Sequence, residues 1–280
     1  MLESTEDRIL ESALTAYQLH ATVTDNAQYC DHWQEPEAAV NACIFHLIGE
    51  GQCILKMDCL DGPQTLVAGD LVVFPHGGAH HLSGDGYTAM LCGQFDFVTG
   101  PKNPILDSLP ECVIVRVSEA GTAFHRVAQI MCEEACSRRF GSRAVLNKLA
   151  DTLFVMTVRH YLNNTTNRRG LLAALADPKL RRALAVMHLN PGQDWTVVEL
   201  AAEACMSRTS FSQFFTAVLG VSPIQYLTQW RMMKALKLLQ DSNLSALAIA
   251  ERFGYQTEAS FRRSFKRVHG HSPGHFRSAK

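Results

Sequence analysis

The hydrophobic positions of this 280-residue chain follow two different patterns. From about Ala21 to Val117, short apolar runs alternate with glycine, proline and aspartate, which predicts short β-strands joined by turns. The runs read ACIFHLIG, GQCILKMD, QTLVAG, DLVVFP, YTAMLCGQFDFV and CVIVRV. Many short strands in one stretch favour a β-barrel or a β-sandwich.

From about Glu119 to Asn163 the apolar positions recur at helical spacing instead. This predicts two connector helices separated at Phe140-Gly141. Their apolar stripes would be Phe124, Val127, Ala128, Met131 and Cys132, then Val145, Leu149, Leu153 and Met156. The polar run that follows is typical of a flexible linker. We therefore expect a first domain over residues 1–163, a linker over 164–176 and a second domain over 177–280.

A motif occurs twice in the second domain. Ser210-Phe211, Phe215, Gly220, Ser222 and Pro223 are each matched by the same residue type 50 positions later, ending at Pro273. Self-similarity at a fixed offset indicates a duplicated supersecondary unit.

Each copy reads as a helix, a turn and a second helix. Thr196 and Glu199 form a capping box before the first helix of copy one, and Ser207 caps its second helix. In copy two, Ser245 and Thr257 are the matching caps. Gly220 and Gly270 end the second helices. The expected inward-facing residues are Val197, Leu200, Ala201, Ala204, Phe211, Phe214, Phe215, Val218, Leu247, Ile249, Ala250, Phe253, Phe261 and Phe265.

A helix-turn-helix unit places its second helix in the DNA major groove. The polar faces of the two second helices supply the candidate DNA-binding residues, which are Arg208, Thr209, Ser210, Gln213, Glu258, Arg262, Arg263, Lys266 and Arg267. A charged face can also be a solvated surface of an ordinary helical hairpin. Here the charges lie on the face that the motif would present to DNA, which favours DNA binding.

The net charge of −1 conceals two halves of opposite sign. Residues 178–280 carry 14 Lys and Arg against 6 Asp and Glu, whereas the rest carries 12 against 21. A basic half suits a nucleic-acid module. The acidic start has no signal-peptide pattern, and no apolar run approaches the ~20 residues of a membrane span. We therefore expect a cytoplasmic protein whose nine cysteines are reduced thiols.

The stretch from about Asp177 to Lys280 resembles the DNA-binding domain of AraC-type transcription regulators. The resemblance is carried by LAAEACMSRTSFSQFF, GVSPIQYL, AIAERFGYQTEASFRRSFKRVHGHSP and GHFR. It implies a seven-helix domain with helices near Lys179–His188 and Pro223–Gln240 and a short one near Pro273–Ser278. It also implies double-stranded DNA as partner, RNA polymerase as a candidate partner, and a homodimer formed through the connector helices.

Within the strand-rich half, Gly69 to His80 resembles the second motif of cupin barrels, and Phe45 to Gly51 the end of the first. The resemblance implies that His80 can bind a metal. The usual His-x-His pair is missing near residues 35–39. Strand alternation lets His46 join His80, and Cys92 on a later strand completes a candidate set for zinc or another transition metal. All three could equally be barrel packing.

Cys30 and Cys92 are further candidates for oxidant-sensing thiols. The sequence as a whole predicts an α+β protein: a cupin-like β-barrel with a helical connector, then an all-α domain with two helix-turn-helix units. We expect a non-enzymatic transcription regulator controlled by a small-molecule, metal or oxidant effector. The alternatives are a cupin-type metalloenzyme with an appended DNA-binding module, and an architectural DNA protein.

Overall fold

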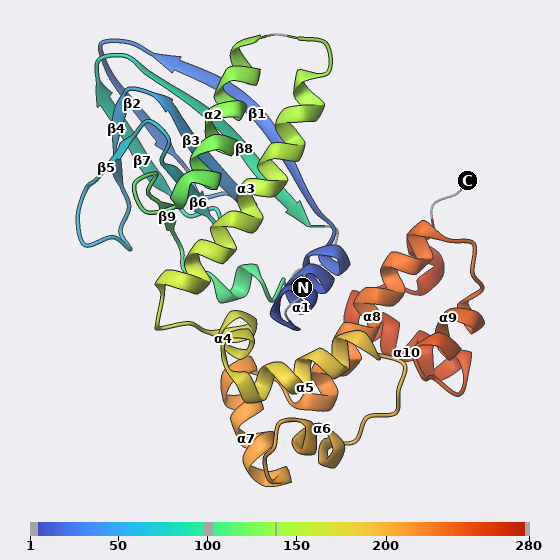
Figure 1. Ribbon diagram of the computed structural model, residues 1–280. Coiled ribbons are helices and arrows are strands. Elements are labelled where there is room, and N and C mark those ends of the chain that lie inside the picture. Colours follow the sequence, from blue (N-terminus) through green and yellow to red (C-terminus); the bar gives the residue numbers. More distant parts are fainter. Residues whose placement is uncertain (1–4, 98–102, 138, 278–280) are drawn as a thin grey trace. The chain divides into compact units, whose positions relative to one another are not determined.

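A computed structural model describes residues 5–97, 103–137 and 139–277 of the chain (Figure 1). These residues form two compact units. The barrel unit comprises residues 19–97 and 105–168. The C-terminal unit comprises residues 169–277 together with 5–18 and 103–104, so the start and the end of the chain share one unit.

Two antiparallel sheets build the barrel unit. Sheet A has the strand order β1-β8-β3-β6-β9, and sheet B has the order β2-β7-β4-β5. The strands are β1 (Leu19–Tyr29), β2 (His32–Glu37), β3 (Cys43–Glu50), β4 (Gln52–Lys56), β5 (Gln64–Val67), β6 (Leu71–Phe74), β7 (His80–Asp85), β8 (Thr88–Phe97) and β9 (Val113–Val115). All six predicted runs contain a strand, which confirms the strand-rich interpretation.

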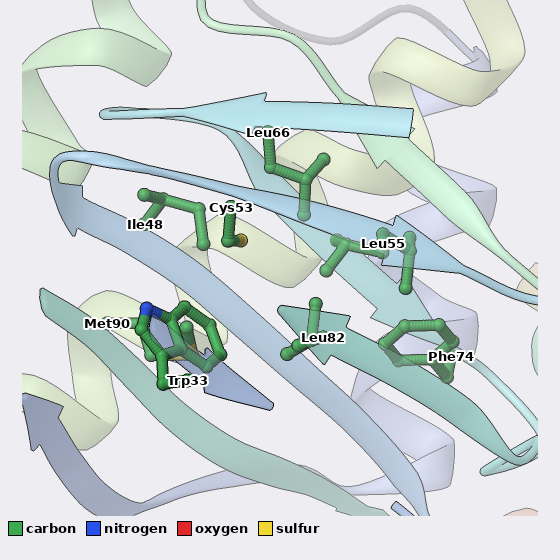
Figure 2. Packing of buried hydrophobic residues seen from close by; sticks show 9 residues of the cluster. Trp33, Ile48, Cys53, Leu55, Leu66, Phe74, Leu82 and Met90 are labelled. Carbon is green, nitrogen blue, oxygen red and sulfur yellow. The ribbon is translucent and has the colours of Figure 1, made fainter. Parts of the chain in front are cut away.

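The core of this unit lies between the two sheets (Figure 2). Side chains from both sheets meet there because alternate residues of each strand point inward. The cluster consists of Trp33, Ile48, Cys53, Leu55, Leu66, Val72, Phe74, Leu82 and Met90. Cys92 packs against this cluster, and the ring of Phe74, one of its members, contacts the rings of His46 and His80.

Helices α2 (Gly121–Ser137) and α3 (Ser142–Asn164) follow the sheets and are separated near Phe140, as expected. Side chains of helix α3 accept hydrogen bonds from backbone N–H groups of the edge strand β1. Asp151 accepts a hydrogen bond from the backbone N–H of Ala21 at 2.6 Å, and Asn147 accepts one from Val23 at 3.0 Å. These bonds satisfy donors that an edge strand would otherwise leave exposed.

The C-terminal unit contains the seven helices that the duplicated motif and the family resemblance together predict. They are α5 (Pro178–Leu189), α6 (Val197–Glu203), α7 (Arg208–Leu219), α8 (Pro223–Asp241), α9 (Ala246–Arg252), α10 (Glu258–His269) and the short 3₁₀ helix η2 (Pro273–Phe276). One further helix, α4 (Gly170–Ala176), precedes them. Helix α4 occupies part of the segment expected to be a linker. Ser278, the expected last residue of the final helix, lies outside the described residues.

The predicted caps are present in both copies. Ser207 accepts a bond from the N–H of Ser210, and Thr257 accepts one from Ser260. Gly220 and Gly270 end α7 and α10 in the left-handed conformation. The capping box of Thr196 is also formed.

Helix α1 (Thr5–Tyr17) packs against α5 and α8 of the C-terminal unit. Its Ile9 is only 1% exposed, and the ring of Tyr17 lies 6.4 Å from that of Trp230. The side-chain amide of Gln18 donates to Gln240 at 3.3 Å. Helix α1, near the start of the sequence, therefore contributes to the hydrophobic core of the C-terminal unit.

Two predictions about burial are wrong. Leu247 is 45% exposed, because α9 turns Ile249 and Ala250 to the core instead. Val145 is also exposed, since the buried stripe of α3 starts one residue later, at Leu146. Helices as short as α9, and stripes with many apolar neighbours, do not determine their rotation by pattern alone.

Candidate functional site

The second helix of each helix-turn-helix unit has one buried and one exposed face. Phe211 and Phe215 of α7, and Phe261 and Phe265 of α10, are fully buried. The nine candidate DNA-binding residues lie outside that core, and all but the partly exposed Glu258 are classed as exposed. The buried phenylalanines thus fix the direction in which the polar residues point.

Helix α10 presents the stronger positive charge. Arg262, Arg263, Lys266 and Arg267 line its exposed side, and Glu258 in its first turn is the one acidic residue of the helix. Both Nε and Nη2 of Arg262 reach the same oxygen, Oε1 of Glu258, at 2.6 Å. Helix α7 carries a single charged residue, Arg208.

A second site lies in the barrel interior, where three polar side chains meet from both sheets. His46 projects from β3 of sheet A, directly opposite Cys92 of β8. Glu37 of β2 and His80 of β7 are paired neighbours in sheet B. The ring of Phe74 stacks on that of His80 at 3.9 Å, which holds the imidazole in place.

The distances between the three sets of ligand atoms match a metal site. His46 Nε2 lies 3.1 Å from His80 Nε2, and the Glu37 oxygens lie 3.4 Å and 3.6 Å from these two nitrogens. Ligands at zinc-like bond lengths of 2.0–2.2 Å are about 3.3–3.6 Å apart when arranged tetrahedrally. The two distances to Glu37 lie in this range, and the nitrogen–nitrogen distance is slightly shorter. Among the described residues, this is the one cluster of such groups with its ligand atoms within 4.8 Å.

The hydrogen bonds around the two histidines orient their lone pairs toward the centre of the cluster. His80 Nδ1 lies 2.9 Å from the carbonyl oxygen of Gly78, so this nitrogen carries the proton and donates. A ring whose proton is on Nδ1 can offer its lone pair from Nε2. His46 Nδ1 lies 3.1 Å from Cys92 Sγ, and donation to that sulfur would leave Nε2 of His46 as a second free ligand.

Burial keeps His46 neutral. It lowers the pKa of His46 to about 3, and the neighbouring His80 lowers it further. Burial also raises the pKa of Glu37, although His80 works in the opposite direction. A carboxylate and two imidazole lone pairs that face one another require a proton or a cation between them.

The structure brings His46 and His80 together as predicted, but it places Cys92 at the other nitrogen of His46. The third group at the centre is Glu37, which the sequence interpretation did not include. Burial raises the pKa of Cys92 to about 12, so its thiol is protonated at neutral pH. Cys30, the other candidate thiol, is exposed. The atoms that could bind a cation are thus Nε2 of His46, Nε2 of His80 and the carboxylate of Glu37. Cys92 faces the other ring nitrogen of His46.

A surface cavity of about 470 Å³ adjoins His80. Its lining includes His81, Lys56 and Met57, which surround the start of β7. The side chain of His80 is itself fully buried, so the cavity borders the barrel interior at this residue without exposing its ligand atoms.

The sequence matches two family profiles. Residues 8–163 match one described as Cupin, and residues 200–279 match one described as Helix-turn-helix domain. In the described part of the chain, none of the helices has the length and apolar character to cross a membrane.

Three curated proteins match along most of their length. The HTH-type transcriptional regulator AlkR of Acinetobacter baylyi is 30% identical over 279 residues, covering 88% of this chain and 90% of AlkR. The RCS-specific HTH-type transcriptional activator RclR of Escherichia coli is 29% identical and covers 91% and 92%. A putative AraC-like transcription regulator of Streptomyces antibioticus is 28% identical and covers 96% and 97%.

Proposed function

The chain belongs to the AraC-type transcription regulators with an N-terminal cupin domain, and from this premise we propose that a metal ion in the barrel controls how it binds DNA. It is a DNA-binding regulator rather than an enzyme. The ligands in our proposal are His46, His80 and Glu37, and Cys92 is the hydrogen-bond partner that orients His46. The single observation that supports it is the convergence of three lone-pair-bearing atoms within 4.8 Å.

Zinc suits this set of ligands, since two imidazoles and one carboxylate leave a fourth position open. A small molecule that enters beside His80 could occupy that position. Such binding would change the metal site without a contact to DNA. Cys92 is poorly suited to sense an oxidant, because burial raises the pKa of its thiol to about 12 and leaves little of the reactive thiolate at neutral pH.

The test measures bound metal and DNA binding in the same preparations. The protein is stripped with chelator, reloaded with zinc and analysed for metal content, and its affinity is measured for a DNA site selected from a random pool. We expect about one zinc per chain and a difference in DNA affinity between the loaded and stripped forms. Glu37→Gln and His80→Ala should lose both, whereas Glu35→Gln, an exposed carboxylate on the same strand, should lose neither. Equal DNA affinity of the loaded and stripped forms would refute metal control.

The DNA-contacting residues and the assembly are part of the proposal. Helices α7 and α10 would enter successive major grooves about 34 Å apart. Arg262 and Arg263 would contact bases, whereas Lys266 and Arg267 would contact phosphates. The protein would act in the cytoplasm as a homodimer joined through α2 and α3, with RNA polymerase as a second partner. Light scattering of the full chain with and without DNA tests the dimer, and a strictly monomeric protein would refute it.

A further inference from the structure

We propose that Glu258 is a specificity-determining residue that acts by positioning Arg262 for a guanine. This inference rests on the proposed placement of α10 in the major groove. It concerns how the helix discriminates between bases, and it assigns Glu258 the role of a positioning residue that does not itself contact a base.

The geometry of the pair carries the argument. Nε and Nη2 of Arg262 both bind Oε1 of Glu258 at 2.6 Å, so one edge of the guanidinium is occupied. The other edge, formed by Nη1 and the second hydrogen of Nη2, is then turned away from the carboxylate. Arginine recognises guanine by donating two parallel hydrogen bonds to O6 and N7, and this remaining edge supplies such a pair.

The position of the pair in the helix fits this role. Thr257 caps α10, which makes Glu258 its first residue and places Arg262 one turn later. Base contacts are made by the N-terminal part of a recognition helix. The arginine is half exposed, at 49%, so without Glu258 it would sample many rotamers and could bind phosphates.

The negative charge of Glu258 should also act against incorrect sequences. A carboxylate at the DNA surface is repelled by phosphates wherever the helix lands, and only the arginine–guanine contact compensates for this repulsion. Removing the charge should therefore raise affinity for random DNA while lowering discrimination. A residue that only stabilised the helix would change both affinities in the same direction.

The first copy of the motif offers an internal comparison. Arg208 and Ser212 stand at the positions that match Glu258 and Arg262, 50 residues earlier. Helix α7 therefore cannot form the same pair. The effect of the carboxylate should be confined to the base pairs that α10 contacts.

The experiment measures the affinity of the full-length protein for a selected site, for variants of that site at each base pair, and for random DNA. In Glu258→Gln we expect random-DNA affinity to rise about two- to fivefold. Preference for guanine at one base pair should fall about five- to tenfold, within the range of a single bidentate contact. Asp241→Asn, which removes the acid of another ion pair four residues apart, Lys237–Asp241, should change neither value.

A double variant separates the possible outcomes. If Glu258 acts through Arg262, adding Glu258→Gln to Arg262→Ala should cause no further loss of guanine preference. An unchanged preference in Glu258→Gln, with Arg262→Ala impaired, would overturn this inference and leave the placement of α10 intact. Undiminished binding by Arg262→Ala would overturn that placement, and the inference with it. Parallel loss of both affinities in Glu258→Gln would show a role in helix stability alone.

Discussion

Replacing Ile9 by alanine should destabilise the C-terminal unit, although the residue lies at the opposite end of the chain. Ile9 is 1% exposed in α1, which packs on α5 and α8. Truncation of a buried isoleucine costs about 2–5 kcal/mol through lost burial and the cavity that remains. With a cost of about 3 kcal/mol and about 4 °C per kcal/mol for a unit of this size, the melting temperature should fall by about 12 °C.

The tryptophans allow each unit to be followed separately. Trp33 belongs to the barrel core, whereas Trp195 and Trp230 lie in the C-terminal unit. In a Trp33→Phe background, fluorescence therefore reports the C-terminal unit alone, and circular dichroism of the sheets reports the barrel. The control is Ile224→Ala, the same substitution at a residue of α8 in the same unit that is 40% exposed. A fluorescence transition that stays within about 2 °C of the parent would show that α1 does not contribute to this core.

Three further outcomes are expected. Burial lowers the pKa of His188 to about 3, so the unfolded state binds a proton first as the pH falls below about 6.5. The contribution of this residue to the free energy of unfolding is therefore complete above that pH and should fall by about 2 kcal/mol at pH 5. Denaturant unfolding of wild type and His188→Gln at pH 8 and at pH 5 measures this loss, which the variant should not show. Gly77→Ala should lower the free energy of unfolding by more than about 2 kcal/mol and reduce zinc binding, because a Cβ at its φ of +61° would lie 2.1 Å from the Val40 carbonyl oxygen. Gly86→Ala is the control: its φ is also positive but no atom lies near the added Cβ, so the comparison separates the clash from the backbone strain. Cys92→Ala removes the atom that faces Nδ1 of His46 and should weaken zinc binding about 10–100-fold in a competition assay, while exposed Cys30→Ala should not; equal affinities would remove Cys92 from the site.

The sequence determined the helix-turn-helix units closely because their signals are local. Thr196, Ser207 and Thr257 act within one helical turn, and Gly220 and Gly270 end their helices at single positions. The pairing of His46 with His80 was also accessible, since strand alternation and a motif place each of them. These features need no knowledge of how distant segments meet.

Glu37 could not be found in this way. Its strand, HWQEPE, is polar and contains Pro36, so it shows no apolar run, and its position depends on pairing with β7. The same holds for α1, whose partners lie far along the chain. Cys92 was placed on the correct strand, but only the register between β3 and β8 shows that it faces Nδ1 of His46.

The hydroxyl caps at matching positions of the two helix-turn-helix units have a consequence for the operator. The buried phenylalanines, caps and terminal glycines of α7 and α10 correspond one to one, so most of the residues that differ lie on the outer faces. The half-buried pairs Phe214/Ser264 and Leu219/His269 also differ and belong to the scaffold. These outer residues could be exchanged between the helices with the scaffold unchanged. A protein altered in this way should recognise the two halves of its site in reverse order, so the direction in which it sits relative to a promoter is set by surface side chains alone.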